Sequence, residues 1–278
     1  MTARASESAQ LLIKTLSSYS SAHVLPAALE VGLQLDAAVA LAPSKLWVSM
    51  IGSLKQLLGQ SRVELRVPVS DYMLIPPPSL SGHEAREQAT AVALLPGWLD
   101  SLDSLTITSW SPLVPWGATD DGVASFERAW SAIAKGIGSV SSILGNKPVV
   151  IAQLGFQSRW RCWVSPNATM LPKITDCARH ADCYHMACQE NGIEGALEAL
   201  HAQPWLKGLY IYGMTTDPTF GGTYDWSHTV HGKPAETTLR RWFGNYTELE
   251  DSSFAAAYVS GISAGNFVAS SGQRTELR

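Results

Sequence analysis

Short apolar runs alternate along the chain with longer segments in which apolar residues recur every three or four positions. The short runs cover residues 29–35, 63–69, 105–110, 149–155 and 206–212. The longer segments cover residues 8–27, 45–58, 125–144, a stretch that ends near residue 202, and 235–243. This alternation predicts five strands and their helices, an α/β fold with a parallel sheet.

Five strands are too few for a closed (β/α)8 barrel, which needs eight. They could form an open, doubly wound sheet, but no glycine-rich phosphate loop follows any of them, so a nucleotide-binding fold has no positive support. The run at residues 149–155 is continuously apolar, which is typical of a strand covered on both faces. Residues 246–278 are rich in Ser, Ala and Gly, and we expect a weakly structured tail there.

The composition changes this picture little but excludes some function classes. The chain has 278 residues, of which 46% are hydrophobic and 16% are charged, so it can bury a sizeable core. Lys and Arg total 20 against 24 acidic residues, which argues against a nucleic-acid-binding protein. No apolar run reaches the roughly 20 residues of a membrane span, and the N-terminus lacks the apolar segment of a secretory signal. We expect no cofactor.

The four cysteines fall within 27 consecutive residues, which leaves three alternatives open. They could be free buried thiols, or they could form two disulfides in an oxidising compartment. Thiolate and imidazole groups could also bind zinc. The zinc candidates are Cys177, His180, Cys183, His185 and Cys188, and Cys162 completes the cysteine set. Two glycosylation sequons, at Asn167 and Asn245, slightly favour the secretory pathway.

Function in α/β folds concentrates at the carboxyl ends of parallel strands. The residues at those ends are Gln34, Asp36, Asp71, Trp110, Gln153, Tyr210, Tyr212 and Asp217. Aromatic rings beside amides and carboxylates suit a sugar, because the rings stack on its apolar faces and the polar groups bind its hydroxyls. We interpret His228 and His231, in the segment after the last strand, as exposed turn residues.

Several segments resemble family 113 of the glycoside hydrolases, a family of β-mannanases. VVIAQLGFQS (149–158) is similar to its strand seven, and WLDSLDSLTITSWSPL (98–113) to its strand six with the preceding helix. DPTFGGTYD (217–225) and GKPAE (232–236) resemble its strand-eight loop and last helix, and EVGLQL (30–35) is similar to its strand four. The resemblance implies an incomplete (β/α)8 barrel over residues 1–245, with five βα units that correspond to strands four to eight.

The resemblance also implies where catalysis would occur and why it fails. The family is retaining, and its acid/base and nucleophile glutamates occupy the positions of Gln34 and Gln153, both amides here. An amide neither exchanges a proton near neutral pH nor attacks as a nucleophile. Asp36 could substitute for one of the lost carboxylates. The strand-end positions and the resemblance together give the sugar-binding candidates Trp110, Gln157, Tyr210, Tyr212, Asp217 and Asp225.

Loss of both carboxylates predicts a non-catalytic relative of this family, a pseudoenzyme that serves as a structural subunit or binds a glycan. Its partners would be another protein chain that covers the open edge of the barrel, or a glycan that contains mannose. Two alternatives stay open. One is an active retaining hydrolase of β-1,4-mannan that uses Asp36, and the other is a small zinc-binding module in the Cys/His segment.

Overall fold

The computed structural model of the chain describes residues 28–30, 44–58, 64–66, 68–70, 97–166, 184–214 and 219–243. The described strands are β1 (Ala28–Glu30), β2 (Glu64–Arg66), β3 (Pro68–Ser70), β4 (Leu105–Thr108), β5 (Val149–Leu154) and β6 (Leu206–Ile211). The described α-helices are α3 (Ser44–Leu58), α6 (Val123–Ile143), α7 (Met186–Leu200) and α8 (Pro234–Phe243). Two 3-10 helices, η1 (Gly97–Ser101) and η2 (Val114–Trp116), flank β4. The predicted mixed α/β class is confirmed.

Every described strand pair is parallel, and the strands lie side by side in chain order. One sheet has the order β1-β2, and the other has the order β3-β4-β5-β6. Because β2 and β3 are separated by residue 67 alone, the run predicted at residues 63–69 pairs first with β1 and then with β4. Strands therefore occur at all five predicted positions, and residues 31–35 of the first apolar run lie outside the described residues.

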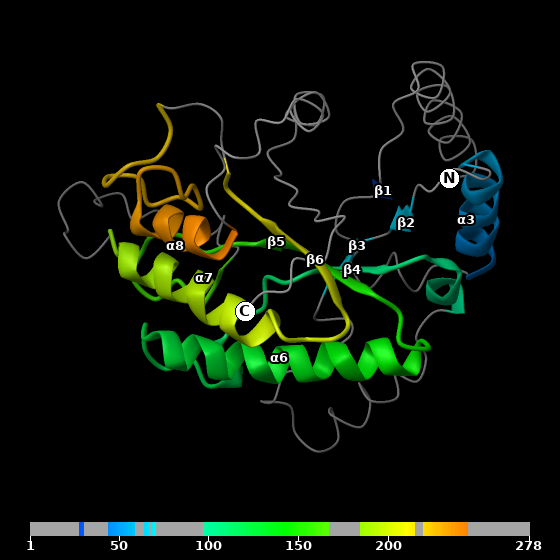
Figure 1. Cartoon of the computed structure of the whole chain (residues 1–278), viewed down its shortest axis with the longest axis horizontal. Helices are drawn as coiled ribbons and strands as arrows, with labels where there is room; N and C mark the ends of the chain where they lie inside the picture. The colour runs from blue at the N-terminus through cyan, green and yellow to red at the C-terminus, as the bar shows by residue number, and fades with distance from the viewer. Residues whose placement is uncertain are drawn as a thin grey trace.

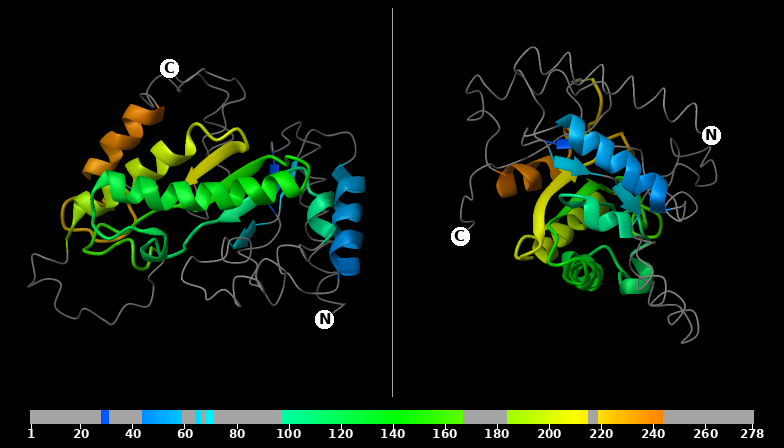
Figure 2. Two further views of the ribbon diagram at one scale, coloured as in Figure 1. Left: turned by 90° about the horizontal axis from the view of Figure 1, so that it is seen from below. Right: turned by 90° about the vertical axis from the view of Figure 1, so that its right-hand side faces the viewer.

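Helices α6, α7 and α8 lie along one side of the larger sheet, while α3 lies at its far end (Figures 1 and 2). α6 buries one continuous stripe at helical spacing, consisting of Phe126, Ala129, Trp130, Ile133, Ala134, Ile137 and Val140. Every residue of β4 is buried, and β5 is buried except at Gln153. This two-sided burial explains the continuous apolar run of β5 in the sequence.

Glycine lets α6 and α7 approach each other closely. A Cβ atom at Gly195 of α7 would lie 2.6 Å from Cβ of Phe126 and 2.7 Å from the backbone nitrogen of Glu127. α7 begins at Met186, because His185 has non-helical backbone angles and its side chain accepts a hydrogen bond from the nitrogen of Cys188. His185 is thus the N-cap of the helix.

Some predictions fall on parts of the chain outside the described residues. These are the helix at residues 8–27 and the tail at residues 246–278. Among the helices that the structure describes, none is both long and apolar enough to cross a membrane.

Candidate functional site

Three of the predicted site residues meet at the carboxyl ends of β4, β5 and β6. Trp110 follows β4, Gln153 lies near the end of β5, and Tyr212 follows β6. Trp110 Nε1 donates a hydrogen bond to Gln153 Oε1 at 3.1 Å. The Trp110 and Tyr212 rings meet edge to face, with their centroids 5.1 Å apart. The prediction that residues at the carboxyl ends of the strands lie close together is therefore confirmed for Trp110, Gln153 and Tyr212.

His228 is a fourth member of this group, and its interpretation as an exposed turn residue is wrong. Its ring meets Trp110 with a centroid distance of 5.4 Å and Tyr212 with one of 5.1 Å. Its Nε2 lies 2.6 Å from the carbonyl oxygen of Pro166, so this nitrogen is the donor. We call Trp110, Gln153, Tyr212 and His228 the aromatic cluster.

Glycines at the ends of β5 and β6 allow the chain that carries His228 to come so close. A Cβ atom at Gly213, where φ is +93°, would lie 2.2 Å from the carbonyl oxygen of His228. A Cβ atom at Gly155 would lie 3.2 Å from Tyr212 and 3.6 Å from the imidazole of His228. A glycine within two residues of the end of each strand was the signal in the sequence that a third segment packs there.

Gln153 has an unusual backbone conformation for a strand residue. Its φ is +63°, a left-handed value that is unfavourable for a residue with a side chain. The pairing register between β5 and β6 shifts between Ile151 and Leu154, on either side of it. Such irregularities re-aim a side chain and occur often beside functional sites. The irregular backbone directs the Gln153 amide toward Trp110. Gln153 is also the only residue of β5 that is half-exposed.

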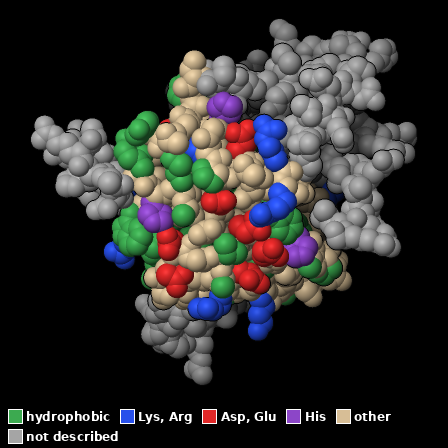
Figure 3. All heavy atoms as spheres, turned by 60° about the vertical axis from the view of Figure 1, so that its left-hand side comes forward, with side chains coloured by type: hydrophobic (Ala, Val, Ile, Leu, Met, Phe, Trp, Pro, Cys, Tyr) green, Lys and Arg blue, Asp and Glu red, His purple; other side chains and the backbone are tan. Residues whose placement is uncertain are grey.

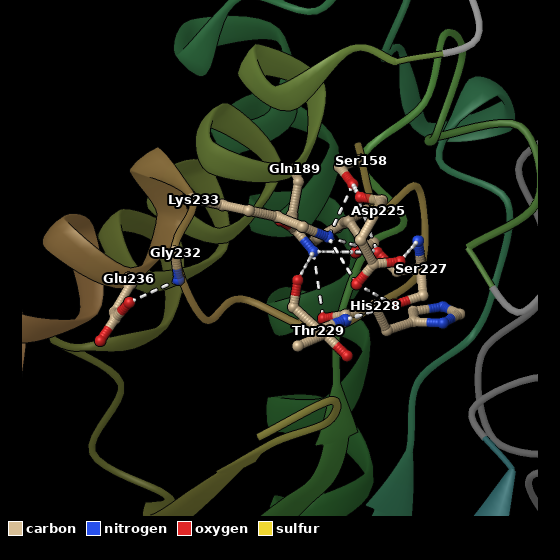
Figure 4. Close-up of polar contacts among 10 residues, drawn as sticks. Ser158, Gln189, Asp225, Ser227, His228, Thr229, Gly232, Lys233 and Glu236 are labelled. Atoms are coloured by element: carbon tan, nitrogen blue, oxygen red, sulfur yellow. Dashed lines mark hydrogen bonds and ion pairs between the residues drawn. The ribbon is translucent and has the colours of Figure 1, made fainter. Parts of the chain in front are cut away.

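A buried polar network, which we call the loop brace, fixes the segment beneath the aromatic cluster (Figure 4). It consists of Ser158, Gln189, Asp225, Ser227 and Lys233. Lys233 Nζ donates to Ser158 Oγ at 2.9 Å and lies 3.4 Å from Asp225 Oδ2. Gln189 Nε2 reaches from α7 and donates to the carbonyl oxygens of Phe156 at 2.8 Å and His228 at 3.0 Å. The brace therefore ties both strand-end loops to α7.

Asp225, which the resemblance implies as a sugar-binding residue, has an internal structural role. Its two carboxylate oxygens accept hydrogen bonds from the backbone nitrogen and the hydroxyl of Ser227, each at 2.8 Å. They also compensate the ammonium group of Lys233, whose side chain is fully buried. Burial lowers the pKa of Lys233, while Asp225 acts in the opposite direction.

Burial also governs the protonation of His228. Loss of solvent lowers its pKa, and the nearby charges of Arg159 and Lys233 add to this effect. The hydrogen bond to Pro166 and the negative charge of Asp225 oppose it. The imidazole is therefore biased toward its neutral form.

The remaining sequence-predicted residues have mixed outcomes. Gln157 is buried three residues after β5, and Tyr210 is half-buried within β6. The following predicted site residues lie outside the described residues: Gln34, Asp36, Asp71, Asp217, Cys177, His180 and Cys183.

The cysteines that the structure describes form a disulfide, between Cys162 and Cys188. This corrects two of the open alternatives for this pair, because a disulfide sulfur is neither a free thiol nor a thiolate ligand. Cys188 is thus not a zinc ligand, and His185 caps α7 and lies 3.2 Å from Asp121 instead. Within the described ranges, no group of three or more His, Cys, Asp or Glu side chains could hold a metal ion.

Exposed aromatic rings surround these strand-end loops. Trp160, Phe220, Tyr224 and Trp226 are 53%, 61%, 83% and 46% exposed. Tyr224 meets Tyr184 edge to face, and Trp160 meets His185, so rings from both loops and from the start of α7 come close to one another. On this side of the molecule, Figure 3 shows hydrophobic side chains interspersed with acidic, basic and histidine side chains.

Comparison of the sequence with known proteins does not assign the chain to a family. No protein-family model matches the chain, and no curated protein has a significantly similar sequence.

Proposed function

We propose that this protein is a non-catalytic relative of the family 113 glycoside hydrolases that binds a glycan at the carboxyl ends of β4, β5 and β6. The observation that supports this most is the aromatic cluster, in which an amide occupies the position of the family's nucleophile. Gln153 Oε1 is engaged by the indole of Trp110, and a neutral amide cannot form a glycosyl ester. The site keeps the means to bind a sugar and lacks the means to cleave it.

The chain-order pairing of the strands supports the barrel-like part of the proposal. In a (β/α)8 barrel each strand pairs with its neighbours in sequence, whereas a doubly wound sheet reverses its order at a switch point. The described order, β1-β2 followed by β3-β4-β5-β6, has no reversal. We accordingly assign the five strand positions to strands four to eight of an incomplete barrel.

The chemistry of the cluster fits a neutral or acidic pyranose better than a nucleotide or a peptide. Tyr212 is half-buried and offers apolar ring surface, while the amide of Gln153 and the imidazole of His228 offer hydrogen bonds to hydroxyls. Trp110 is only 7% exposed and packs against the rings of Tyr212 and His228. Exposed rings such as those of Trp160 and Tyr224 could extend contact along a sugar chain. A mannose-containing glycan is the ligand that the resemblance favours.

Binding of β-1,4-linked mannose oligomers, measured by calorimetry, tests this proposal. The wild type should bind at millimolar concentration or tighter, and Trp110→Ala should weaken binding by about tenfold or more because the ring that positions Tyr212, His228 and the Gln153 amide is lost. Phe243→Leu is the control, since Phe243 is an aromatic residue 37% exposed at the end of α8. Absence of binding at millimolar oligomer would contradict the proposal.

A hydrolysis assay separates the non-catalytic protein from the active alternative. The wild type should release no reducing sugar from mannan, and the double substitution Gln34→Glu with Gln153→Glu should introduce activity if the site is otherwise intact. Release by the wild type that disappears in Asp36→Asn would instead support an active hydrolase.

A structural subunit is the second candidate function, and one feature of the sheet favours it. Within the sheet order that the structure describes, β6 pairs only with β5, so its other edge could accept a strand from another chain. Light scattering of the native protein tests this idea. A stable complex with a second chain would support it, and a monomer at all concentrations would oppose it.

A further inference from the structure

Arg159 is a buried arginine with no carboxylate partner in the part of the chain that the structure describes. The residue is only 6% exposed. A guanidinium group has five N–H donors, yet the hydrogen bond described here is a single one, from Nη2 to the carbonyl oxygen of Ser165 at 3.2 Å. Its Nε is buried and has no hydrogen-bond partner. Buried charges are normally paired, so this group needs an explanation.

The position of Arg159 connects it to the aromatic cluster. It follows Ser158, which the loop brace holds through Lys233. Its Nη2 donates to the carbonyl oxygen of Ser165, and the next carbonyl oxygen along the chain, that of Pro166, accepts the hydrogen bond of His228 Nε2. The charge of Arg159 also contributes to the lowered pKa of His228. The unpaired guanidinium therefore lies beside the residues that we propose to bind the glycan.

The charges around His228 do not cancel. Lys233 and Arg159 are both cationic, and Asp225, 3.4 Å from Lys233, compensates one of them. Of the other described anions near these loops, Asp121 lies 3.2 Å from His185, and Glu236 lies 3.5 Å from His231 and 2.8 Å from Arg240. Among the described residues around His228, one positive charge, that of Arg159, thus has no compensating anion.

We infer that Arg159 binds the carboxylate of a uronic acid residue, so that the glycan recognised by this protein is an acidic one. The pyranose ring of that residue would lie against Tyr212, with its carboxylate on the guanidinium. This inference rests on the proposed glycan-binding function and specifies its ligand.

A carboxylate is the group that matches the unused donors. Guanidinium and carboxylate form two parallel charge-assisted hydrogen bonds, which a neutral hydroxymethyl group cannot reproduce. Because Arg159 is already removed from water, it loses little further solvation when the ligand binds. The ligand charge instead relieves an unfavourable state of the free protein.

Two oligomers that differ only at C6 provide the test. β-1,4-linked mannuronate and β-1,4-linked mannose oligomers of equal length carry a carboxylate and a hydroxymethyl group there. By calorimetry, the wild type should bind the mannuronate oligomer about 10- to 100-fold more tightly. Arg159→Gln should remove this preference, whereas Arg159→Lys should retain part of it because the charge remains.

Arg161→Gln is the matched control, because Arg161 is an exposed arginine two residues along the chain. It removes the same net charge and should leave the preference unchanged. If Arg159→Gln does not fold, the salt dependence of the wild type decides. Added salt should weaken mannuronate binding more than mannose binding, and equal weakening would overturn the inference.

The outcomes separate this inference from the function on which it rests. Equal affinity of the wild type for the two oligomers would overturn the role of Arg159 and leave glycan binding supported. Binding of neither oligomer would overturn both.

Discussion

The helix-covered side of the sheet and the strand-end loops are held together by different kinds of interaction. Between α6, α7 and the sheet, the contacts are apolar and close, as at Trp130, which is 1% exposed, and at Gly195. At the strand ends, the loop brace relies on an ion pair and on hydrogen bonds to backbone carbonyls. The first region gains its stability from burial, and the second gains a defined geometry.

This difference separates the interactions that stabilise the fold from those that position the proposed binding site. Apolar packing tolerates the loss of a distant polar group, whereas a loop fixed by directed hydrogen bonds shifts when one is removed. The aromatic cluster and Arg159 both belong to the loop side. Substitutions in the helical layer should therefore affect mainly the free energy of unfolding, and substitutions in the loops should affect mainly ligand binding.

Trp130→Ala should have the largest effect on stability. Trp130 lies in the buried stripe of α6, and truncation of a fully buried Trp costs about 3–5 kcal/mol. Urea unfolding measures the loss, and glycan affinity of the protein that remains folded should be unchanged. The control is Ile143→Ala at the exposed end of α6, where Ile143 is 61% exposed, with an expected effect within about 0.5 kcal/mol. If Trp130→Ala changed the free energy of glycan binding as much as the free energy of unfolding, the proposed difference between the two regions would be wrong.

The Cys162–Cys188 disulfide should have the next largest effect, because it joins the loop after β5 to α7. It closes a separation of 26 residues, and its removal by Cys162→Ala with Cys188→Ala should cost about 2–4 kcal/mol. Unlike Trp130→Ala, this change should also weaken glycan binding, since the loop carries Arg159. Reductant should destabilise the wild type by a similar amount and the double variant far less. Equal stability of the two proteins would contradict this prediction.

The sequence predicted the fold best where burial leaves a pattern. β5 lies between two covered faces and is therefore a continuous apolar run, and α6 has apolar residues at every third or fourth position. The pattern could not show that α7 begins only at Met186, because a His185 side chain determines that boundary. It also could not select one state for the cysteines, since a disulfide depends on the path of the chain between them.

The site was predictable to the extent that it lies on strands. Trp110, Gln153 and Tyr212 end three neighbouring strands, so their proximity follows from the parallel sheet. His228 and Arg159 lie on loops, and a loop's path depends on contacts such as that of Lys233 with Ser158, which no local pattern encodes. The glycines at positions 155 and 213 were the only local sign in the sequence that the segment carrying His228 packs closely against the strand ends.

The smallest effect that we predict is the dependence of stability on pH through His228. Its pKa is lowered in the folded protein, chiefly by burial, so below the ordinary value of 6.5 the unfolded chain binds the proton more readily. Stability should therefore fall as the pH decreases below 6.5 and rise as the pH increases through that window. One proton contributes a slope of at most about 1.4 kcal/mol per pH unit.

His228→Phe keeps a ring against Trp110 and Tyr212 but removes the titrating group, so it should flatten this slope. Urea unfolding between pH 7.5 and 5.5, a window chosen to lie about one unit above the ordinary carboxyl pKa values, measures the effect. His201→Phe is the control, because His201 contacts Trp242 at the opposite end of α7, away from the loop brace. An equal flattening in both variants, or a wild-type slope of opposite sign, would show that the imidazole of His228 is not held neutral by the packing of the aromatic cluster.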